Sequence, residues 1–281
     1  MKKTIKTVVM LLIFVMAFVM TGSISEAKTD KFTLYVGEEL GYSYIGMGTI
    51  KSVKSSNSKV VSAKKYKGGS WMVAKKTGKA TVTVKGARGT WKHNITVKKA
   101  DFKVSFAKMS GNDKYCQVSV KNNTSGFFDK FKVEATFYDA NGNKLYDNME
   151  VFYYVGKKKT ANSELYMGSD FAKVDLSKTT YKLTFDRDID YKYKDYAKKV
   201  KTTVSEDKDY VNIKAKTSYK GKGNVYVAYD IFFYDASNNL VSITTYTKFL
   251  YKKANTGTTK VLKPSRAVTY KINKRVMLKE Y

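Results

Sequence analysis

The sequence FYDANGNKL at residues 137–145 returns, slightly changed, as FYDASNNL at residues 233–240. In each copy an apolar-rich run leads into a turn containing Asn or Gly and then into a second run, which is typical of a β-hairpin. The copies are 96 residues apart, and TYKL at 180–183 returns as TYKI at 269–272 with a similar spacing. A self-match of this length predicts a duplicated domain, with residues 100–196 as the first copy and 197–281 as the second.

The first 27 residues have the pattern of an export signal. Lys2, Lys3 and Lys6 precede an unbroken apolar run at 8–20, and the small residues Ser25 and Ala27 then form a cleavage site. The run is shorter than the roughly 20 residues of a membrane span, so we favour a cleaved signal peptide over an uncleaved anchor. No second run of that length follows. We expect a secreted, extracellular protein associated with the cell envelope, with no transmembrane segment after the signal is removed.

Residues 28–99 alternate between apolar and polar side chains in short runs separated by turns, a pattern typical of a β-sandwich. VGE at 36–38, SSNSKVV at 55–61 and GKATVTV at 78–84 resemble the bacterial immunoglobulin-like domain of group 2. WMV at 71–73 departs from that pattern, which usually has a Gly-led strand there. The resemblance implies a domain of surface adhesins or a spacer of wall-associated proteins, and it brings no catalytic residues.

The two copies carry a weaker resemblance. VKNNT at 120–124, a further strand and then FYD resemble the FxLYD-type and related fibronectin-like modules of exported bacterial proteins. No helical periodicity longer than about two turns follows the signal. We therefore predict an all-β chain with three β-sandwich domains in tandem, one immunoglobulin-like and two related repeats, after the signal peptide.

The charge of the chain indicates a class of partner. Lys and Arg number 53 against 24 Asp and Glu, a net charge of +29. Without the first 27 residues, which hold three Lys and one Glu, the net charge is +27 over 254 residues. Such a protein favours polyanions, and outside a cell these are anionic cell-wall polymers, acidic polysaccharide or anionic lipid. The alternative is a solubilising coat of lysines. We expect no specific nucleic acid partner.

Cysteine and histidine are too few for most catalytic or metal chemistry. Cys116 is the only cysteine, so no intramolecular disulfide forms, and its alternating strand pattern predicts that it packs as a small apolar side chain. His93 is the only histidine and lacks the partners of a zinc site. No G-x-S-x-G sequence is present. We predict no enzyme activity, no cofactor and no metal.

Two acidic clusters have a simple alternative explanation. Asp139 begins a run that resembles a calcium loop and has Glu150 at its twelfth position, but the second copy has Tyr246 there, so a hairpin turn explains both copies better. Carboxylates also alternate at residues 186, 188 and 190, where neighbouring lysines neutralise them without metal.

Aromatic and basic residues adjoin in two places. They are Tyr191, Lys192, Tyr193 and Lys194, and then Tyr251, Lys252 and Lys253. Strand alternation places the first two tyrosines on one face and the two lysines on the other. These residues are the candidate contacts for a polyanion or a sugar. The alternative is that tyrosine, a favoured strand residue, covers a half-buried sheet.

The sequence thus predicts an exported, non-enzymatic binding or adhesion protein of the cell surface or wall, held to anionic envelope polymers by its positive charge. No sortase-type tail or lipobox is present, so we expect retention to be either non-covalent or absent. A surface protein is a second kind of partner. The alternative function is a structural spacer or accessory subunit without a ligand of its own. A third possible function is that of a secreted enzyme. The sequence lacks the group of polar residues that a catalytic site would need, which opposes this interpretation.

Overall fold

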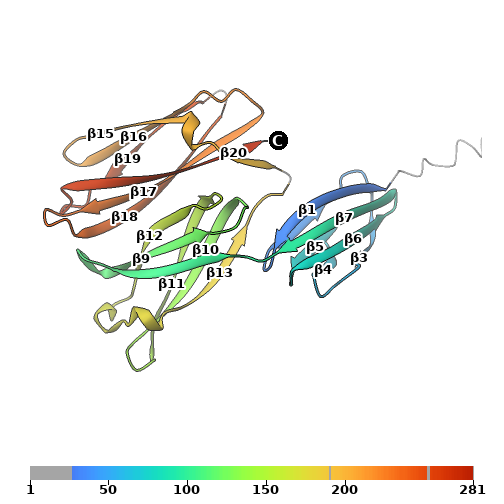
Figure 1. Cartoon of the computed structure of the whole chain (residues 1–281), viewed down its shortest axis with the longest axis horizontal. Helices are drawn as coiled ribbons and strands as arrows, with labels where there is room; N and C mark the ends of the chain where they lie inside the picture. Colours follow the sequence, from blue (N-terminus) through green and yellow to red (C-terminus); the bar gives the residue numbers. More distant parts are fainter. Residues whose placement is uncertain (1–26, 190, 252–253, 281) are drawn as a thin grey trace, which may run out of the picture. The chain divides into compact units, whose positions relative to one another are not determined.

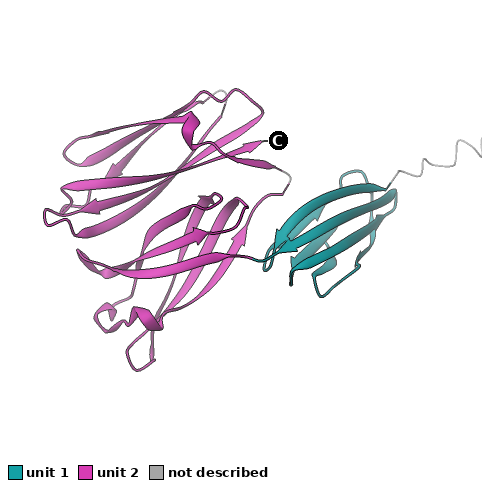
Figure 2. Ribbon diagram, viewed as in Figure 1, with its two compact units in different colours: residues 1–99 teal, residues 100–281 magenta. Residues whose placement is uncertain are grey.

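The computed structural model describes residues 27–189, 191–251 and 254–280. It contains strands and three short 3-10 helices, which confirms the predicted all-β class. Two compact units divide the chain at Lys99 and Ala100 (Figures 1 and 2). The described part of the chain has no helix with the length and hydropathy of a membrane span. The predicted signal peptide, apart from Ala27, lies outside the described residues.

Unit 1 is a sandwich of a four-stranded and a three-stranded sheet, in the orders β1-β7-β6-β3 and β2-β5-β4. β1 runs parallel to β7, and the other neighbours are antiparallel. The strands are β1 (Lys28–Tyr35), β2 (Glu39–Ser43), β3 (Ile50–Ser55), β4 (Val61–Tyr66), β5 (Gly69–Ala74), β6 (Gly78–Gly86) and β7 (Gly89–Lys98).

Strand alternation fills the core of unit 1. Ala80, Val82 and Val84 of β6 are buried, and so is every second residue of β7 from His93 to Val97. Met72 of the facing sheet is also fully buried. The residues between them must therefore point away from the core.

Unit 2 holds two further sandwiches with the same strand order. The first consists of β8 (Phe102–Met109), β9 (Asn112–Asn122), β10 (Phe128–Tyr138), β11 (Lys144–Val155), β12 (Thr160–Tyr166), the 3-10 helices η1 (Phe171–Lys173) and η2 (Leu176–Lys178), and β13 (Thr180–Asp186). The second consists of β14 (Lys192–Asp195), η3 (Ala197–Lys199), β15 (Val200–Glu206), β16 (Tyr210–Thr217), β17 (Gly223–Tyr234), β18 (Leu240–Leu250), β19 (Thr256–Leu262) and β20 (Thr269–Glu280).

The duplication is visible in sheet order and in detail. The sheets β11-β10-β13 and β12-β9-β8 of the first sandwich correspond to β18-β17-β20 and β19-β16-β15 of the second. Each central strand shifts its register after the Phe of FYD, at Phe137 and at Phe233. Each turn is closed by the Asp, whose carboxylate accepts the backbone N–H four residues later: Asp139 from Asn143 at 2.8 Å and Asp235 from Asn239 at 2.9 Å.

One detail of the predicted repeat needs correction. The sequence match aligned Tyr181 with Tyr270, and the two do lie on corresponding strands, β13 and β20. However, Tyr181 pairs with Ala135, whereas Tyr270 pairs with Phe233, the counterpart of Phe137. The true register differs by two residues, which preserves the face of the sheet and hides the slip from any alternation pattern.

The second sandwich has a strand that the first lacks. β14 lies before the predicted boundary at residue 196, yet it pairs with β20 of the second sandwich. The boundary between the repeats stays a prediction, and β14 belongs with the sheet that it extends.

β17 is buried on both faces because the two sandwiches of unit 2 pack together. Tyr229 and Ile231 point into the core of the second sandwich. Ala228 and Asp230, on the opposite face, are also fully buried. Strands β12 and β18 make most of the contact between the sandwiches. We call this contact the seam.

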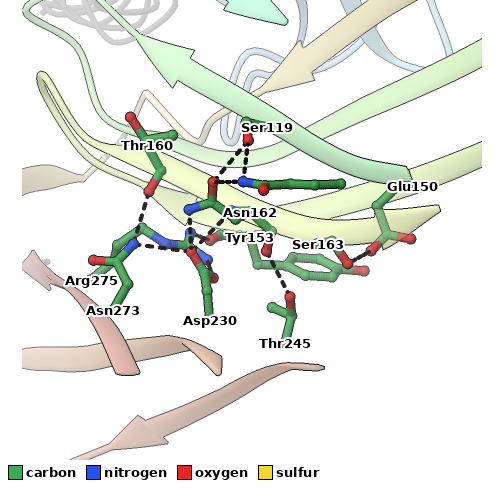
Figure 3. A network of polar contacts seen from close by, with 11 residues as sticks. Ser119, Glu150, Tyr153, Thr160, Asn162, Ser163, Asp230, Thr245, Asn273 and Arg275 are labelled. Carbon is green, nitrogen blue, oxygen red and sulfur yellow. Dashed lines mark hydrogen bonds and ion pairs between the residues drawn. The ribbon is translucent and has the colours of Figure 1, made fainter. Parts of the chain in front are cut away.

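A buried polar network crosses the seam (Figure 3). Asp230 and Arg275 form an ion pair, and their side chains are 0% and 1% exposed. The second Asp230 oxygen accepts from the backbone N–H of Asn162 at 2.9 Å and from Asn273 Nδ2 at 3.1 Å. Arg275 Nη1 donates to the carbonyl of Tyr153 at 2.6 Å. A buried charge pair needs such additional hydrogen bonds to offset the cost of removing its charges from water, and here both sandwiches supply them.

Candidate functional site

The outer face of the four-stranded sheet of unit 1 is basic. Because alternate residues of β6 and β7 enter the core, the ones between them line the solvent side, and the pairing of β1 and β3 extends the same face. We call this surface the basic face. Its exposed lysines are Lys31, Lys54, Lys79, Lys85, Lys92 and Lys98. Its other members are Thr29, Thr33, Ser52, Thr81, Thr83, Asn94 and Thr96.

No carboxylate of the described part of unit 1 lies on the basic face. Asp30 points to the opposite side of β1, where it accepts the indole N–H of Trp91. Glu38 is 1% exposed and accepts the backbone N–H of Tyr35 at 2.8 Å. Glu39 is on β2, in the other sheet. The six lysines are therefore not neutralised by neighbouring acids.

A shallow hollow of about 590 Å³ lies on this face. Lys31 and Lys79 line it together with hydroxyl and amide side chains. Thr81 donates to Asn94 Oδ1 at 2.9 Å, and Ser56 Oγ accepts the backbone N–H of Thr81, also at 2.9 Å. Ammonium, hydroxyl and amide donors around an open depression can hold phosphate or carboxylate oxygens from several sides.

The positive charge of the chain is unevenly divided between the units. Residues 28–99 hold 16 Lys and Arg against 3 Asp and Glu, a net charge of +13. Residues 100–281 hold 34 against 20, a net charge of +14 over a stretch more than twice as long. In unit 2 many of the lysines are paired with acids, for example Lys194 with Glu280 at 2.7 Å. The density of free positive charge is thus highest on unit 1.

A polar cluster beneath the sheet explains the single histidine. His93 is fully buried, and its Nε2 lies 2.8 Å from the hydroxyl of Tyr44, which also contacts Ser70 Oγ at 2.6 Å. Asp30 lies 3.5 Å from His93 Nδ1. Burial lowers the pKa of His93 to about 4, against a smaller opposing effect of Asp30. His93 is therefore neutral at physiological pH, and it packs among aromatic rings as part of the core.

Tyr191 and Tyr193, which the sequence proposed as ligand contacts, lie at the edge of the seam. The hydroxyl of Tyr193 donates to Asp129 at 2.6 Å, and its ring lies nearly parallel to that of Phe127. Lys279 lies over the ring of Tyr191 at 4.3 Å. Burial and the contact with Asp129 raise the pKa of Tyr193. Tyr193 therefore links β14 of the second sandwich to the first sandwich, and Tyr191 contacts Lys279 of β20.

The other proposed contacts are divided. Lys192 and Lys194 are exposed, and Lys194 is the residue paired with Glu280. Tyr251 is exposed and packs against Phe249, with ring centroids 6.1 Å apart. Lys252 and Lys253 lie outside the described residues. The described residues among these candidates do not form one continuous surface. That they contact a ligand stays a prediction.

The acidic runs are occupied by internal contacts. Asp139 accepts from the backbone N–H groups of Asn141 and Asn143 and from the Asn143 side chain, which lowers its pKa and makes the segment a turn. Asp186 pairs with Lys130 at 3.4 Å and Asp188 with Lys279 at 3.5 Å, so lysines from other strands balance them. Asp190 is not described. Within the described ranges, no three Asp, Glu, His or Cys side chains gather as a metal site.

Cys116 is buried and free. Its thiol lies 3.6 Å from the carbonyl of Leu165, and burial raises its pKa to about 12. A thiol with so high a pKa is almost wholly protonated at neutral pH and is a poor nucleophile. Cys116 is thus a packing residue, as its strand pattern predicted.

Comparison with known proteins leaves the family open. No protein-family model matches the sequence, and no curated protein matches it. The resemblance to group 2 bacterial immunoglobulin-like domains therefore stays a prediction.

Several solved structures match the chain at low sequence identity. They include a transglutaminase from red sea bream, with 9% identity, a TM-score of 0.21 and 62% of this chain covered. The I9–I11 tandem of titin matches with 9% identity and a TM-score of 0.20, over 89% of this chain and 96% of the tandem. Latent PorU from Porphyromonas gingivalis matches with 8% identity and a TM-score of 0.20, over 91% of this chain and 32% of PorU. The chain covers 29% of the transglutaminase. TM-scores this low establish neither a shared fold nor a function, so function must be inferred from the chain's own residues.

Proposed function

We propose that this protein is exported and binds anionic polymers of the cell envelope through the basic face of unit 1. The observation that supports the proposal is the face itself: six exposed lysines on one sheet, interspersed with hydroxyl and amide groups and without a carboxylate. Export is inferred from the first 27 residues of the sequence.

Binding of this kind is electrostatic and largely insensitive to sugar identity. Each lysine contributes a contact that is screened within a Debye length of about 8 Å at physiological salt and about 3 Å at 1 M. Several such contacts on a repeating polyanion add up, and all weaken together as salt rises.

The test compares two variants with the same change in charge. In the face variant, Lys79, Lys85, Lys92 and Lys98 are replaced by Ser. In the control, the exposed lysines Lys64, Lys65, Lys75 and Lys76, which are off the basic face, are replaced by Ser. Affinity of the mature protein for wall teichoic acid and for polyphosphate is measured over a salt series.

We expect the face variant to bind at least about tenfold more weakly, with a shallower salt dependence, and the control to stay close to the native protein. Equal losses in both variants would indicate non-specific attraction to overall charge. No binding by the native protein at low salt would contradict the proposal and favour a spacer.

A further inference from the structure

A row of five aromatic side chains crosses the edge of the seam in unit 2. Tyr153 and Tyr154 come from β11 of the first sandwich, Tyr226 and Phe249 from β17 and β18 of the second, and Tyr251 follows β18. Successive ring centroids in this order are 6.0, 4.5, 6.5 and 6.1 Å apart. Tyr153 is 40%, Phe249 57% and Tyr251 40% exposed. We call these five residues the aromatic row.

The backbone is strained where the row crosses from one sandwich to the other. Tyr154 has φ of 55°, a left-handed conformation that is rare for a bulky aromatic residue. Its ring makes the closest contact of the row, with Tyr226 of the other sandwich. Strain of this kind persists only where the surroundings enforce it, and it is concentrated at binding and catalytic sites.

The buried network supplies that constraint. Arg275, from the second sandwich, donates to the carbonyl of Tyr153, the residue directly before Tyr154 (Figure 3). Its other terminal nitrogen is held by Asp230, which is also held by Asn162 of the first sandwich. The position of Tyr154 is thus determined by both sandwiches, and the row exists only when they are joined.

The chemistry of the row indicates the kind of ligand. All five side chains are uncharged at neutral pH, and burial raises the pKa of Tyr154 to about 12. Three of the rings are at least 40% exposed, so apolar ring surface is accessible to a ligand, and the tyrosines add hydroxyl groups. They are too few for a stable protein interface, which buries about 800 Å² on each partner. Sugar rings, with apolar C–H faces and peripheral hydroxyls, match a narrow row of this kind.

We propose that the aromatic row binds a polysaccharide chain by stacking its sugar rings on Phe249, Tyr251 and Tyr153. The site lies wholly in unit 2 and does not depend on the basic face. Stacking also differs from ion pairing in its response to salt, because it involves no charge. The two forms of binding can therefore be separated in one protein.

The test uses the full mature protein in 1 M NaCl, where binding to polyanions is screened. Soluble α-glucan, β-glucan, mannan and chitin oligosaccharides serve as probes, with affinity electrophoresis and calorimetry as readouts. The variant Phe249→Ala/Tyr251→Ala removes two exposed rings. The control, Tyr210→Ala/Leu262→Ala, removes a cross-strand pair of exposed apolar residues away from the row.

We expect at least one probe to bind in 1 M NaCl, and the row variant to lose at least tenfold in affinity while the control loses none. Tyr154→Gly, which removes a ring and accepts the positive φ, should also lose binding and remain folded by circular dichroism. Failure of every probe to bind, or equal binding by all variants, would overturn the proposal. Capture of a protein through the row without sugar binding would overturn it as well.

Discussion

His93 links the core of unit 1 to pH. In the folded protein its pKa is lowered to about 4 by burial, whereas in the unfolded chain it has the ordinary value of 6.5. Above pH 6.5 both states are neutral at this residue. As pH falls, the unfolded chain takes up the proton first, so the free energy of unfolding decreases until the folded pKa is passed. The fold therefore favours the neutral histidine over the charged one.

We expect unit 1 to lose about 3 kcal/mol of stability between pH 6.5 and pH 4 from this residue. The chain's two tryptophans, Trp71 and Trp91, both lie in unit 1, so tryptophan fluorescence during urea unfolding reports on it selectively. His93→Gln should be less stable at pH 7 and should show a flatter pH dependence over this range. An unchanged pH profile in the variant would assign the effect to carboxylates instead.

Asp230 is the central residue of the polar network that crosses the seam of unit 2. It is fully buried, and it is bound by Arg275, Asn162 and Asn273. Removing one partner of a buried ion pair leaves the other charge without compensation, which typically costs about 3–5 kcal/mol. An exposed pair such as Asp186 with Lys130 contributes far less, because water screens it.

Asp230→Ala is therefore expected to destabilise unit 2 by about 3–5 kcal/mol, and Asp186→Ala to change little. Urea unfolding followed by circular dichroism measures the loss, and tryptophan fluorescence should show unit 1 unaffected. If the two variants were equally stable, the buried network would contribute no more to the stability of unit 2 than an exposed ion pair does.

The hairpin turns show how much a local pattern determines. FYD followed by a turn with Asn or Gly predicted both turns and the duplication, because turn chemistry and strand alternation are encoded within a few residues. The register of β13 and β20 was not predictable, since a slip of two residues leaves every side chain on the same face. The alternation at residues 191–194 indicated a strand, but its pairing with β20 was not predictable, because that pairing joins segments about 85 residues apart.

The two turns also provide a natural comparison. Gly142 and Asn238 occupy the same position, with φ of 88° and 61°. Glycine and asparagine tolerate this conformation, and a β-branched residue does not. We expect Gly142→Val to cost about 1–2 kcal/mol and Asn238→Gly to be nearly neutral. Urea unfolding of both variants checks this, and a neutral Gly142→Val would show that the turn can adopt another conformation.

The candidate surfaces were only partly accessible to sequence reasoning. Lysine or threonine alternates with apolar residues along 79–85, so the polar side of this strand is visible in the sequence. The basic face emerges only when β6 is paired with β7 and the three carboxylates of the domain are placed elsewhere. The aromatic row combines residues from 153 to 251, so no local pattern contains it. Conversely, the sequence offered Tyr191 and Tyr193 either as ligand contacts or as cover for a half-buried sheet, and in the structure Tyr193 contacts Asp129 while Tyr191 lies beneath Lys279. Tertiary contact decides which tyrosines remain exposed.

The division of charge leads to a prediction for the whole molecule. Residues 28–99 form a compact unit with its own core and carry +13 of the charge, including the basic face. We expect a fragment of residues 28–99 to fold as a β-sandwich by circular dichroism, and to bind polyphosphate with most of the salt dependence of the mature protein. A fragment of residues 100–281, with +14 spread over a longer stretch and many of its lysines paired, should bind far more weakly.

Comparable binding by the two fragments would show that total charge, rather than the basic face, attracts the polymer. A 28–99 fragment that remained a random coil would instead refute the domain boundary at residue 99, and the charge comparison would then be repeated in the full chain with the lysine variants.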